Sequence, residues 1–400
     1  MFIKIVKSIL MNKSKIFFII TRLNNGGVAK CAIWLSGMLD EKKFDTILIS
    51  GKTEGNEDDI LWYSQQYAVS PVIIPQMRRS LNPFSDLIAL LKIYRLILKE
   101  KPVIIHTQMS KAGLLGRTAA IVYNQFHKDK IKIIHTFHGH VFHSYFSGIK
   151  TRLFVFLENM LARRTDTIIS ISERLNDEIR QVIKIKDSNQ LRVIPLGVDF
   201  SPPKRHPDRK SRNRDIHIGM LGRLAPVKNY RLAFDIARIL LREKIPVKIV
   251  IGGGGCQNDF KKLQPFCLEN ISLLGNISDP RLFWEEIDVA MVTSKNEGTP
   301  VALIEAMLTN IPFIASEVGG ILDMTSGSMS EKGNLLIYDN CILVRGFNPE
   351  DFVKAIRIFC DGKYRKSSGD SGEKYARERY SIFRMIKGME ALYKEVLEYE

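Results

Sequence analysis

The sequence of 400 residues predicts an α/β protein built from two domains, each with a doubly wound, mostly parallel sheet. Short apolar runs of β type alternate with helical apolar periods along almost the whole chain, which is typical of parallel α/β units. A polar, basic stretch at 204–214 interrupts this alternation near the middle and has the composition of an exposed linker. The length also favours two domains.

Each half contains its own series of predicted strands. Those of the first half are residues 16–21, 46–50, 72–75, 103–107, 131–136, 167–171 and 191–195. Those of the second half are 216–221, 247–251, 271–274, 289–293, 313–315 and 342–344. One helix has a clear start, because Asn82 suits the N-cap and Pro83 the first helical position. A last helix, at about 373–398, has no strand after it.

These elements divide the chain into five parts. We expect a basic extension (1–13), a first doubly wound domain (14–200), a linker (201–214), a second doubly wound domain (215–372) and a C-terminal helix (373–400). Met11 is a second possible start of translation. Ligands of doubly wound sheets bind at the carboxyl ends of the strands, so the site is expected in a cleft between the domains.

Composition narrows the class of protein. With 45% hydrophobic and 26% charged residues, the chain has the content of a soluble globular protein with an ample core. Its five cysteines form no C-x-x-C pair, which argues against a zinc site or a disulfide framework and fits a reducing cytosol. Residues 2–20 alternate lysines with apolar residues, and no apolar run approaches the roughly 18 residues needed to cross a bilayer.

The net charge of +16 indicates a polyanionic partner or surface. Nucleic acid is not expected, because no zinc-finger, RNP or basic-zipper pattern is present. An anionic membrane fits better, and a cytoplasmic protein at the inner face of the cell membrane is the expectation. Basic residues mix with aromatic ones near Lys4, Lys7, Lys13 and Lys15, at Arg78-Arg79 and over 141–164. Solvated lysines and core aromatics explain the same residues equally well.

Two glutamates eight positions apart follow the predicted strand at 289–293. Glu297 lies in a glycine-proline turn, and Glu305 lies in an apolar helix whose first turn suits Pro300. A carboxylate at Glu305 is half-buried unless a ligand covers it, and it needs hydrogen-bond donors that sugar or ribose hydroxyls would supply. For Glu305 alone, a surface position on an ordinary helix is the simpler explanation.

Two cations follow the first strand of the second half. Arg223 and Lys228 leave the end of the strand at 216–221 on one loop, where they are positioned to clamp a diphosphate. Two solvated loop cations are the alternative. The sequence has no Asp-x-Asp pair to hold a diphosphate cation, so positive side chains would have to do that work.

Glycines follow two of the strands. Gly26 and Gly27 open the first helix and would let backbone amides approach an anion, although a plain strand-to-helix turn fits equally. Gly253, within the run 252–255, allows close approach to a ligand or a tight turn.

Histidines cluster at the end of the strand at 131–136. His138, between His135 and His140, could hydrogen-bond a sugar or act in proton transfer. Three histidines also raise a metal hypothesis, but no Asp/Glu cluster accompanies them, so no metal site is expected.

Together these motifs indicate a diphosphate ligand with hydroxyl-rich groups on both sides. Their order resembles that of glycosyltransferase family 4, retaining enzymes with two Rossmann-like domains in the GT-B architecture. The resemblance covers about residues 14–395 and rests on Gly26-Gly27, His138-Gly139, Ser172-Glu173, Gly197-Val198-Asp199, Gly222-Arg223-Leu224, Lys228-Asn229, Gly252–Gly254 and the pair Glu297 and Glu305.

The resemblance implies a role for each candidate. Arg223 and Lys228 would hold the donor diphosphate, Glu297 would contact hydroxyls of the transferred sugar, and Glu305 the nucleotide ribose. His138 would lie by the sugar on the acceptor side, with the Gly26-Gly27 loop over the phosphates. The segment Thr299, Pro300 and Val301, at a helix N-terminus, would face the same charge. The final helix would cross back onto the first domain. Gly253 and Ala29 depart from the family's usual residues, which leaves the donor's identity less certain.

The implied reaction is metal-independent transfer with retention, from a nucleotide sugar to a saccharide or undecaprenyl-linked acceptor in bacterial surface polysaccharide synthesis. UDP is the commoner carrier in this family, and GDP fits the motifs equally. No cofactor is implied beyond the donor itself, which is a substrate. The alternatives are a nucleotide-sugar epimerase of the same fold, a phosphorylase, and a protein that only binds nucleic acid or anionic lipid.

Overall fold

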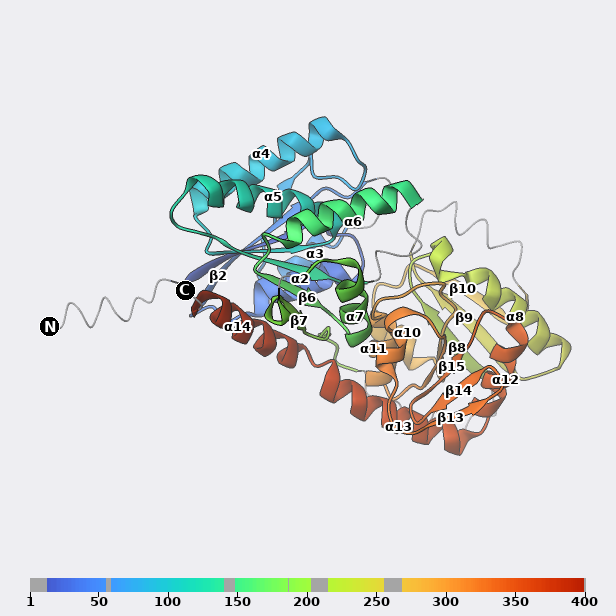
Figure 1. Ribbon diagram of the computed structural model, residues 1–400. Helices are drawn as coiled ribbons and strands as arrows, with labels where there is room; N and C mark the ends of the chain where they lie inside the picture. The colour runs from blue at the N-terminus through green and yellow to red at the C-terminus, as the bar shows by residue number, and fades with distance from the viewer. Residues whose placement is uncertain are drawn as a thin grey trace. The chain divides into compact units, whose positions relative to one another are not determined.

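The computed structural model describes residues 13–54, 59–139, 148–185, 187–202, 215–254 and 268–398. The predicted linker at 201–214 lies almost wholly outside them. Contacts divide the chain into two units, Met1–Gly197 with Phe383–Glu400 and Val198–Ile382. Each unit is an α/β structure around one sheet (Figure 1), so the predicted fold class is confirmed.

The sheet of the first unit is parallel, and its order among the described residues is β3-β2-β1-β4-β5-β6-β7. Each of its strands was predicted within a few residues. Their bounds are β1 (Ser14–Ile20), β2 (Phe44–Gly51), β3 (Val72–Ile74), β4 (Ile104–Gln108), β5 (Lys132–Phe137), β6 (Thr167–Ser170) and β7 (Leu191–Val193). The order reverses beside β1, which makes the sheet doubly wound.

Helices cover both faces of this sheet. On one face, Phe17 and Ile19 of β1 pack in a core with α4 and α5. On the other, Phe18 contacts the ring of Tyr393 in α14. The predicted start of α4 is confirmed, because the side chain of Asn82 accepts from the Ser85 N–H at 3.0 Å. The helices are α2 (Gly27–Met38), α3 (Leu61–Gln65), α4 (Pro83–Glu100), α5 (Ser110–Phe126), α6 (Gly148–Ala162), α7 (Glu173–Val182) and α14 (Ile382–Glu398), with a 3-10 turn η1 (Ser188–Gln190).

The second unit has a mixed sheet of order β10-β9-β8-β11-β12-β15-β14-β13. Its parallel strands, all predicted, are β8 (Ile216–Leu221), β9 (Val247–Gly252), β10 (Ile271–Gly275), β11 (Val289–Val292), β12 (Phe313–Ser316) and β15 (Cys341–Val344). Its helices among the described residues are α8 (Tyr230–Arg242), α10 (Pro280–Glu285), α11 (Val301–Leu308), α12 (Pro349–Phe359) and α13 (Gly362–Arg379), with the 3-10 turns η3 (Pro226–Lys228) and η5 (Gly319–Met324).

The sequence pattern does not predict the antiparallel hairpin at the edge of this sheet. It consists of β13 (Met329–Lys332) and β14 (Leu335–Tyr338), and β14 pairs antiparallel with β15. All four residues of β13 are exposed, so the strand has no apolar alternation from which it could be recognised.

The prediction of a single last helix was wrong. The structure has two helices, α13 and α14, separated by Tyr380 and Ser381. Tyr380 is buried, and its carbonyl accepts from the Val198 N–H at 2.9 Å, which takes it out of helical hydrogen bonding. Residues 373–379 therefore belong to the second unit, where the Asn310 side chain donates to Glu373 at 3.0 Å.

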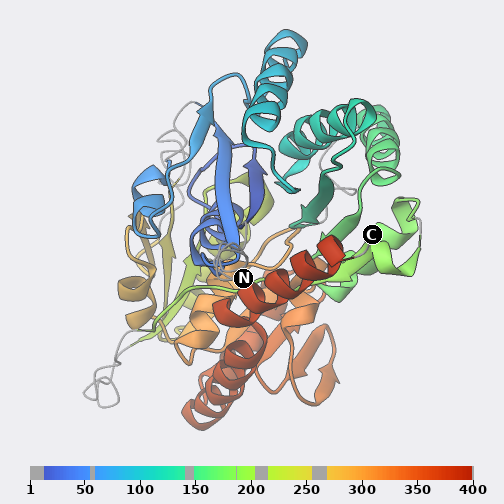
Figure 2. The same ribbon diagram turned by 90° about the vertical axis from the view of Figure 1, so that its left-hand side faces the viewer.

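The last helix, α14, is part of the first unit. Figure 2 shows it, in dark red, lying along the first sheet, and the carboxylate of Glu390 accepts from the Asp40 N–H at 2.8 Å. Inside this contact, His106 of β4 lies between the Tyr393 hydroxyl and the Thr136 hydroxyl, each 2.7 Å from one of its ring nitrogens. Burial lowers the pKa of His106 to about 3, so the ring is neutral in the folded protein.

This buried histidine predicts a pH dependence of stability. The unfolded chain takes up a proton at His106 below about pH 6.5, which the folded chain does not do until its much lower pKa is reached. The contribution of His106 to the free energy of unfolding should therefore be constant above about pH 6.5. Below that pH, this residue alone should lower the free energy of unfolding by about 1.4 kcal/mol per pH unit. Urea unfolding at pH 7.5, 6.0 and 5.0 checks this. His106→Asn should flatten the slope by that amount, and an unchanged slope would contradict the assignment.

Candidate functional site

The candidate site of the second unit lies where its strand order reverses. β8 pairs with β9 on one side and with β11 on the other, so the loops after β8 and β11 leave the sheet at the switch point. In doubly wound sheets, ligands bind at this position. The loop after β8 carries Arg223 and Lys228, and the segment after β11 carries Glu297.

Hydrogen bonds hold these two segments together. The Lys295 N–H donates to the Val227 carbonyl at 2.8 Å. The hydroxyl of Thr293, which is fully buried, donates to the carbonyls of Lys228 and Asn229 at 3.0 and 3.2 Å. Asn229 itself adopts a left-handed conformation, with φ of 53°, and begins α8. The backbone near Lys228 is therefore fixed by contacts that the spacing of the motifs did not reveal.

Lys228 and Glu297 meet as an ion pair. Lys228 Nζ lies 2.5 Å from Glu297 Oε1, and the Ser294 hydroxyl donates to the same oxygen at 2.5 Å. Within the described part of the chain, Glu297 Oε2 has no such partner. The two side chains are 25% and 11% exposed, so both are reachable from solvent yet partly shielded from it. A ligand here would meet a cation and a carboxylate oxygen side by side.

Arg223 is on the same loop but is exposed, and none of the described residues forms an ion pair with it. Hydrogen bonds fix the backbone of its two neighbours. The Gly222 N–H donates to the Gly252 carbonyl and the Leu224 N–H donates to the Gly254 carbonyl, both at 3.0 Å. The Arg223 side chain therefore extends from a fixed backbone, and it adds a second positive charge to the site.

Gly253 has a packing role that its sequence context left open. Its φ is +144°, and a Cβ built on it would lie 1.9 Å from the Gly222 carbonyl oxygen. The close approach is thus between two loops of the protein itself. We expect Gly253→Ala to displace the Gly222–Leu224 loop and lower the free energy of unfolding by about 1–3 kcal/mol.

Thermal unfolding of Gly253→Ala checks that expectation. The matched control is Gly222→Ala, whose new Cβ would lie no closer than 3.4 Å to any neighbour and should be tolerated. Equal melting temperatures for the two variants would contradict this packing role.

The start of α11 differs slightly from the prediction. Pro300 is the N-cap residue, with φ of −68° and ψ of 114°, and the helix begins at Val301. Thr299, before it, is buried. Gly320 stabilises the turn before the helix, because its N–H donates to the Glu297 carbonyl at 3.1 Å. A Cβ on Gly320 would lie 2.3 Å from the Gly298 oxygen, so the turn that carries Glu297 requires a glycine here, which no sequence motif indicates.

Glu305 is not half-buried as predicted. Only 5% of the residue is exposed, and its Oε2 accepts from the indole N–H of Trp284 at 3.2 Å. Trp284 lies on α10, 21 positions earlier, and is itself buried. The protein therefore supplies at least one of the donors that the buried carboxylate needs. A contact between Glu305 and a ribose stays a proposal.

In the first unit, His138 follows β5 and contacts β4. Its Nε2 lies 3.0 Å from the Oε1 of Gln108, which can only accept, so Nε2 carries the proton and Nδ1 is left as an acceptor. Burial lowers the pKa of His138 to about 4, so it is neutral near pH 7. Its Nδ1 can thus accept a hydrogen bond from a ligand hydroxyl, but the ring supplies no positive charge.

Only one of the other two histidines of the cluster lies within the described residues. His135 is buried with its Nδ1 2.8 Å from the Thr107 hydroxyl, and His140 lies outside the described residues. In the ranges that the structure describes, no group of three His, Cys, Asp or Glu side chains is placed to hold a metal ion.

Gly26 and Gly27 lie at the N-terminus of α2. Gly26 is the N-cap residue, and its carbonyl accepts from the Lys30 N–H at 3.1 Å. A Cβ on Gly26 would have no neighbour closer than 3.8 Å, so internal packing does not require a glycine there.

Comparison with known proteins identifies the family. A model described as Glycosyltransferase Family 4 matches residues 25–202, and one described as Glycosyl transferases group 1 matches residues 215–361. The chain belongs to glycosyltransferase family 4. Together the two matches span most of both units and include all of the candidate site residues named above.

Relatives of this glycosyltransferase include enzymes of surface polysaccharides. The UDP-Gal:alpha-D-GlcNAc-diphosphoundecaprenol alpha-1,3-galactosyltransferase of Escherichia coli is 29% identical over 310 residues, which are 74% of this chain and 77% of that one. The capsular polysaccharide biosynthesis glycosyltransferase CapM of Staphylococcus aureus is 25% identical over 97% of this chain and 99% of its own. The crystal structure of Anabaena HepE in complex with UDP and glucose superposes with a TM-score of 0.75 at 17% identity, over 95% of this chain and 99% of HepE, and has the GT-B fold.

Proposed function

We propose that this glycosyltransferase transfers a sugar, with retention, from a UDP-sugar to a lipid-linked saccharide during assembly of a bacterial surface polysaccharide. The relatives support the substrate class, since the similar E. coli enzyme is named for a UDP-galactose donor and a diphosphoundecaprenol-linked acceptor. CapM is named for capsule synthesis. We further propose that the protein acts at the inner face of the cell membrane, where such an acceptor is embedded.

The observation that carries this proposal is the Lys228–Glu297 pair at the switch point of the second sheet. When the bond between the sugar and the diphosphate breaks, negative charge grows on the leaving diphosphate. Lys228 and Arg223 supply positive charge for it, and such electrostatic stabilisation is usually the largest contribution to catalysis. Glu297 would accept hydrogen bonds from hydroxyls of the transferred sugar through the oxygen that Lys228 and Ser294 leave unoccupied.

We propose that these side chains, and not a metal ion, meet the charge of the diphosphate. Turnover should then be the same in excess EDTA as in added Mg²⁺ or Mn²⁺. Strict dependence on either ion would contradict this part of the proposal. We assign His138 to a hydrogen bond with the substrate from the first unit and the Gly26-Gly27 amides to its phosphates.

The two glutamates should have separable effects. Glu297→Gln is expected mainly to lower kcat, because its partner is the sugar that changes charge during the reaction. Glu305→Gln is expected mainly to raise the KM of the donor, by about tenfold for a loss of about 1.4 kcal/mol. Steady-state kinetics with varied donor separates the two, and a kcat effect alone at Glu305 would contradict its assignment.

The overall proposal is tested by offering UDP-, GDP- and ADP-sugars to the purified protein with and without a diphosphoundecaprenol-linked saccharide. We expect product only with the acceptor, and NMR of the new glycosidic bond should show the anomeric configuration of the donor. Conversion of the donor sugar without any acceptor would instead identify an epimerase.

A further inference from the structure

The outward face of α4 is apolar. Its exposed large side chains lie three, four and seven positions apart, which places them in one line along the helix. They are Phe84, Leu87, Leu91 and Leu98, of which 75%, 53%, 50% and 41% is exposed. The opposite side of the helix carries the buried residues Ala89, Ile93 and Ile97. This helix therefore has a second apolar stripe that the core does not use.

A similar line runs along α6. Its exposed members are Leu153, Phe156 and Met160, again three and four positions apart, with exposures of 58%, 61% and 54%. α5 packs against both α4 and α6, and Figure 1 shows the three helices on the same side of the first sheet. The two lines therefore belong to one side of the first unit.

The charges beside these lines are positive. Exposed basic residues lie at Lys92, Arg95 and Lys99 on α4, and at Arg152, Arg163 and Arg164 on or just after α6. The carboxylates of the two helices are paired elsewhere: Asp86 with Lys111 at 2.6 Å, Glu100 with Lys15 at 2.8 Å, and Glu158 with the buried Arg117. Lys99 also pairs with Glu100, at 3.3 Å, whereas the other five basic residues have no ion-pair partner among the described residues. The outward faces thus combine apolar side chains with basic ones that are mostly unopposed by an acid.

We propose that the outward faces of α4 and α6 form a docking surface for an anionic lipid bilayer. Amphipathic helices with aromatic or leucine side chains on one face and flanking Lys or Arg bind in the interfacial layer of a membrane. Their basic residues are attracted by anionic headgroups. A second copy of the chain fits less well, since a symmetric dimer would bring the same positive faces together. No helix in the described ranges is long and apolar enough to cross a membrane.

This surface differs from the one expected from the sequence. Lys15 is held in ion pairs with Glu100 and Asp45, so it is not available to lipid. Phe154 packs against the core of the first unit, whereas Phe156, two positions later, is exposed. Residues 1–12 and 140–147, which hold much of the basic-aromatic pattern, lie outside the described residues.

The docking surface is tested by sedimentation of the purified full-length protein with vesicles. We expect binding to vesicles of phosphatidylglycerol and phosphatidylethanolamine and much weaker binding to phosphatidylcholine. The triple variant Phe84→Ser, Leu87→Ser, Leu91→Ser should lower the partition coefficient at least tenfold, and Lys92→Gln and Arg95→Gln by about fivefold each. The matched control is Leu282→Ser, on α10 of the second unit, whose side chain is 64% exposed and whose loss should change nothing.

Melting temperatures of all variants within about two degrees of the wild type verify that the first unit is intact. The proposal is overturned if the wild type does not bind anionic vesicles, or if the α4 variants bind these vesicles as well as the wild type does. It is also overturned, in favour of a second copy, if the triple variant turns a dimer into a monomer in size-exclusion chromatography while vesicles are not bound.

The proposal extends the proposed function, but vesicle binding needs no catalysis. A wild type that binds vesicles and transfers no sugar would therefore contradict the proposed function alone.

Discussion

Lys228→Met should lower kcat at saturating donor by about 10²–10³-fold, which corresponds to about 3–4 kcal/mol of activation free energy. Methionine keeps much of the length of the side chain and removes the charge that would face the leaving diphosphate. It also leaves the carboxylate of Glu297 with the Ser294 hydroxyl but without its 2.5 Å ion-pair partner. Single-turnover measurements with the preferred UDP-sugar and the lipid-linked acceptor check the effect on the chemical step.

Two further variants make the Lys228 test specific. Lys228→Arg keeps the charge but not its compact shape, and should recover part of the rate. Lys332→Met removes an exposed lysine from β13, at the far edge of the same sheet, and should leave kcat unchanged. A Lys228→Met enzyme with wild-type kcat would exclude the assigned role.

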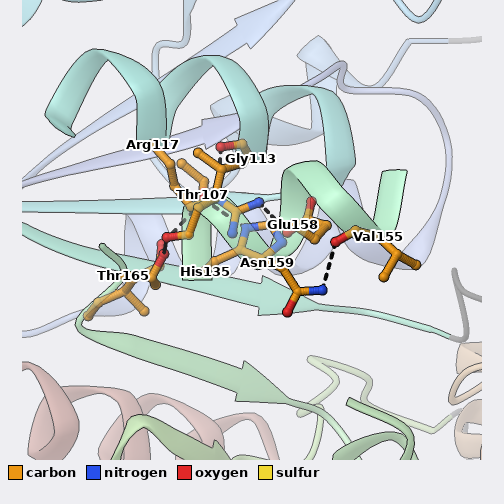
Figure 3. A network of polar contacts seen from close by, with 10 residues as sticks. Thr107, Gly113, Arg117, His135, Val155, Glu158, Asn159 and Thr165 are labelled. Carbon is orange, nitrogen blue, oxygen red and sulfur yellow. Dashed lines mark hydrogen bonds and ion pairs between the residues drawn. The ribbon is translucent and has the colours of Figure 1, made fainter. Parts of the chain in front are cut away.

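Arg117→Met should lower the free energy of unfolding by about 3–5 kcal/mol, because it leaves a carboxylate buried without its partner. Arg117 of α5 and Glu158 of α6 form an ion pair of 2.6 Å, with side chains that are 0% and 3% exposed (Figure 3). Arg117 Nε also donates to the Gly113 carbonyl at 2.9 Å. Beside the pair lies His135, whose pKa is well below its usual range because of burial and, secondarily, the Arg117 charge.

The double variant Arg117→Met, Glu158→Leu is the informative control for the buried pair. Replacing both charges with apolar groups removes the uncompensated carboxylate and should recover most of the lost stability. Chemical denaturation of the wild type, both single variants and the double variant gives the coupling between the residues. If Arg117→Met alone unfolds like the wild type, the pair does not hold α5 and α6 as described.

The strands could be predicted because buried parallel strands are short, continuous apolar runs, such as 216–221 and 289–293. The cations and Glu297 were found for a related reason, since they directly follow such runs. Exposed β13 offers no such pattern. The break before α14 depends on a hydrogen bond between Val198 and Tyr380, residues whose proximity no local period encodes.

The missing parts of the site are contacts between segments distant in sequence. Trp284 donates to Glu305 across 21 positions, and Gln108 accepts from His138 across 30. A helical or strand period says which face a residue occupies but not which side chain meets it there. The prediction that Glu305 needs donors was sound, whereas the identity of a donor required the fold.

The return of α14 to the first unit has a consequence for synthesis on the ribosome. When residues 1–197 have emerged, the face of the sheet that carries Phe18 and His106 still lacks Tyr393, which is made almost 200 residues later. At translation rates of about 5–20 residues per second, the part of that face packed against Tyr393 stays uncovered for about 10–40 seconds. We expect nascent chains halted after residue 197 to be digested by protease faster than the same unit in the finished protein. The first unit, which is the first to be synthesised, is therefore the last to complete its fold.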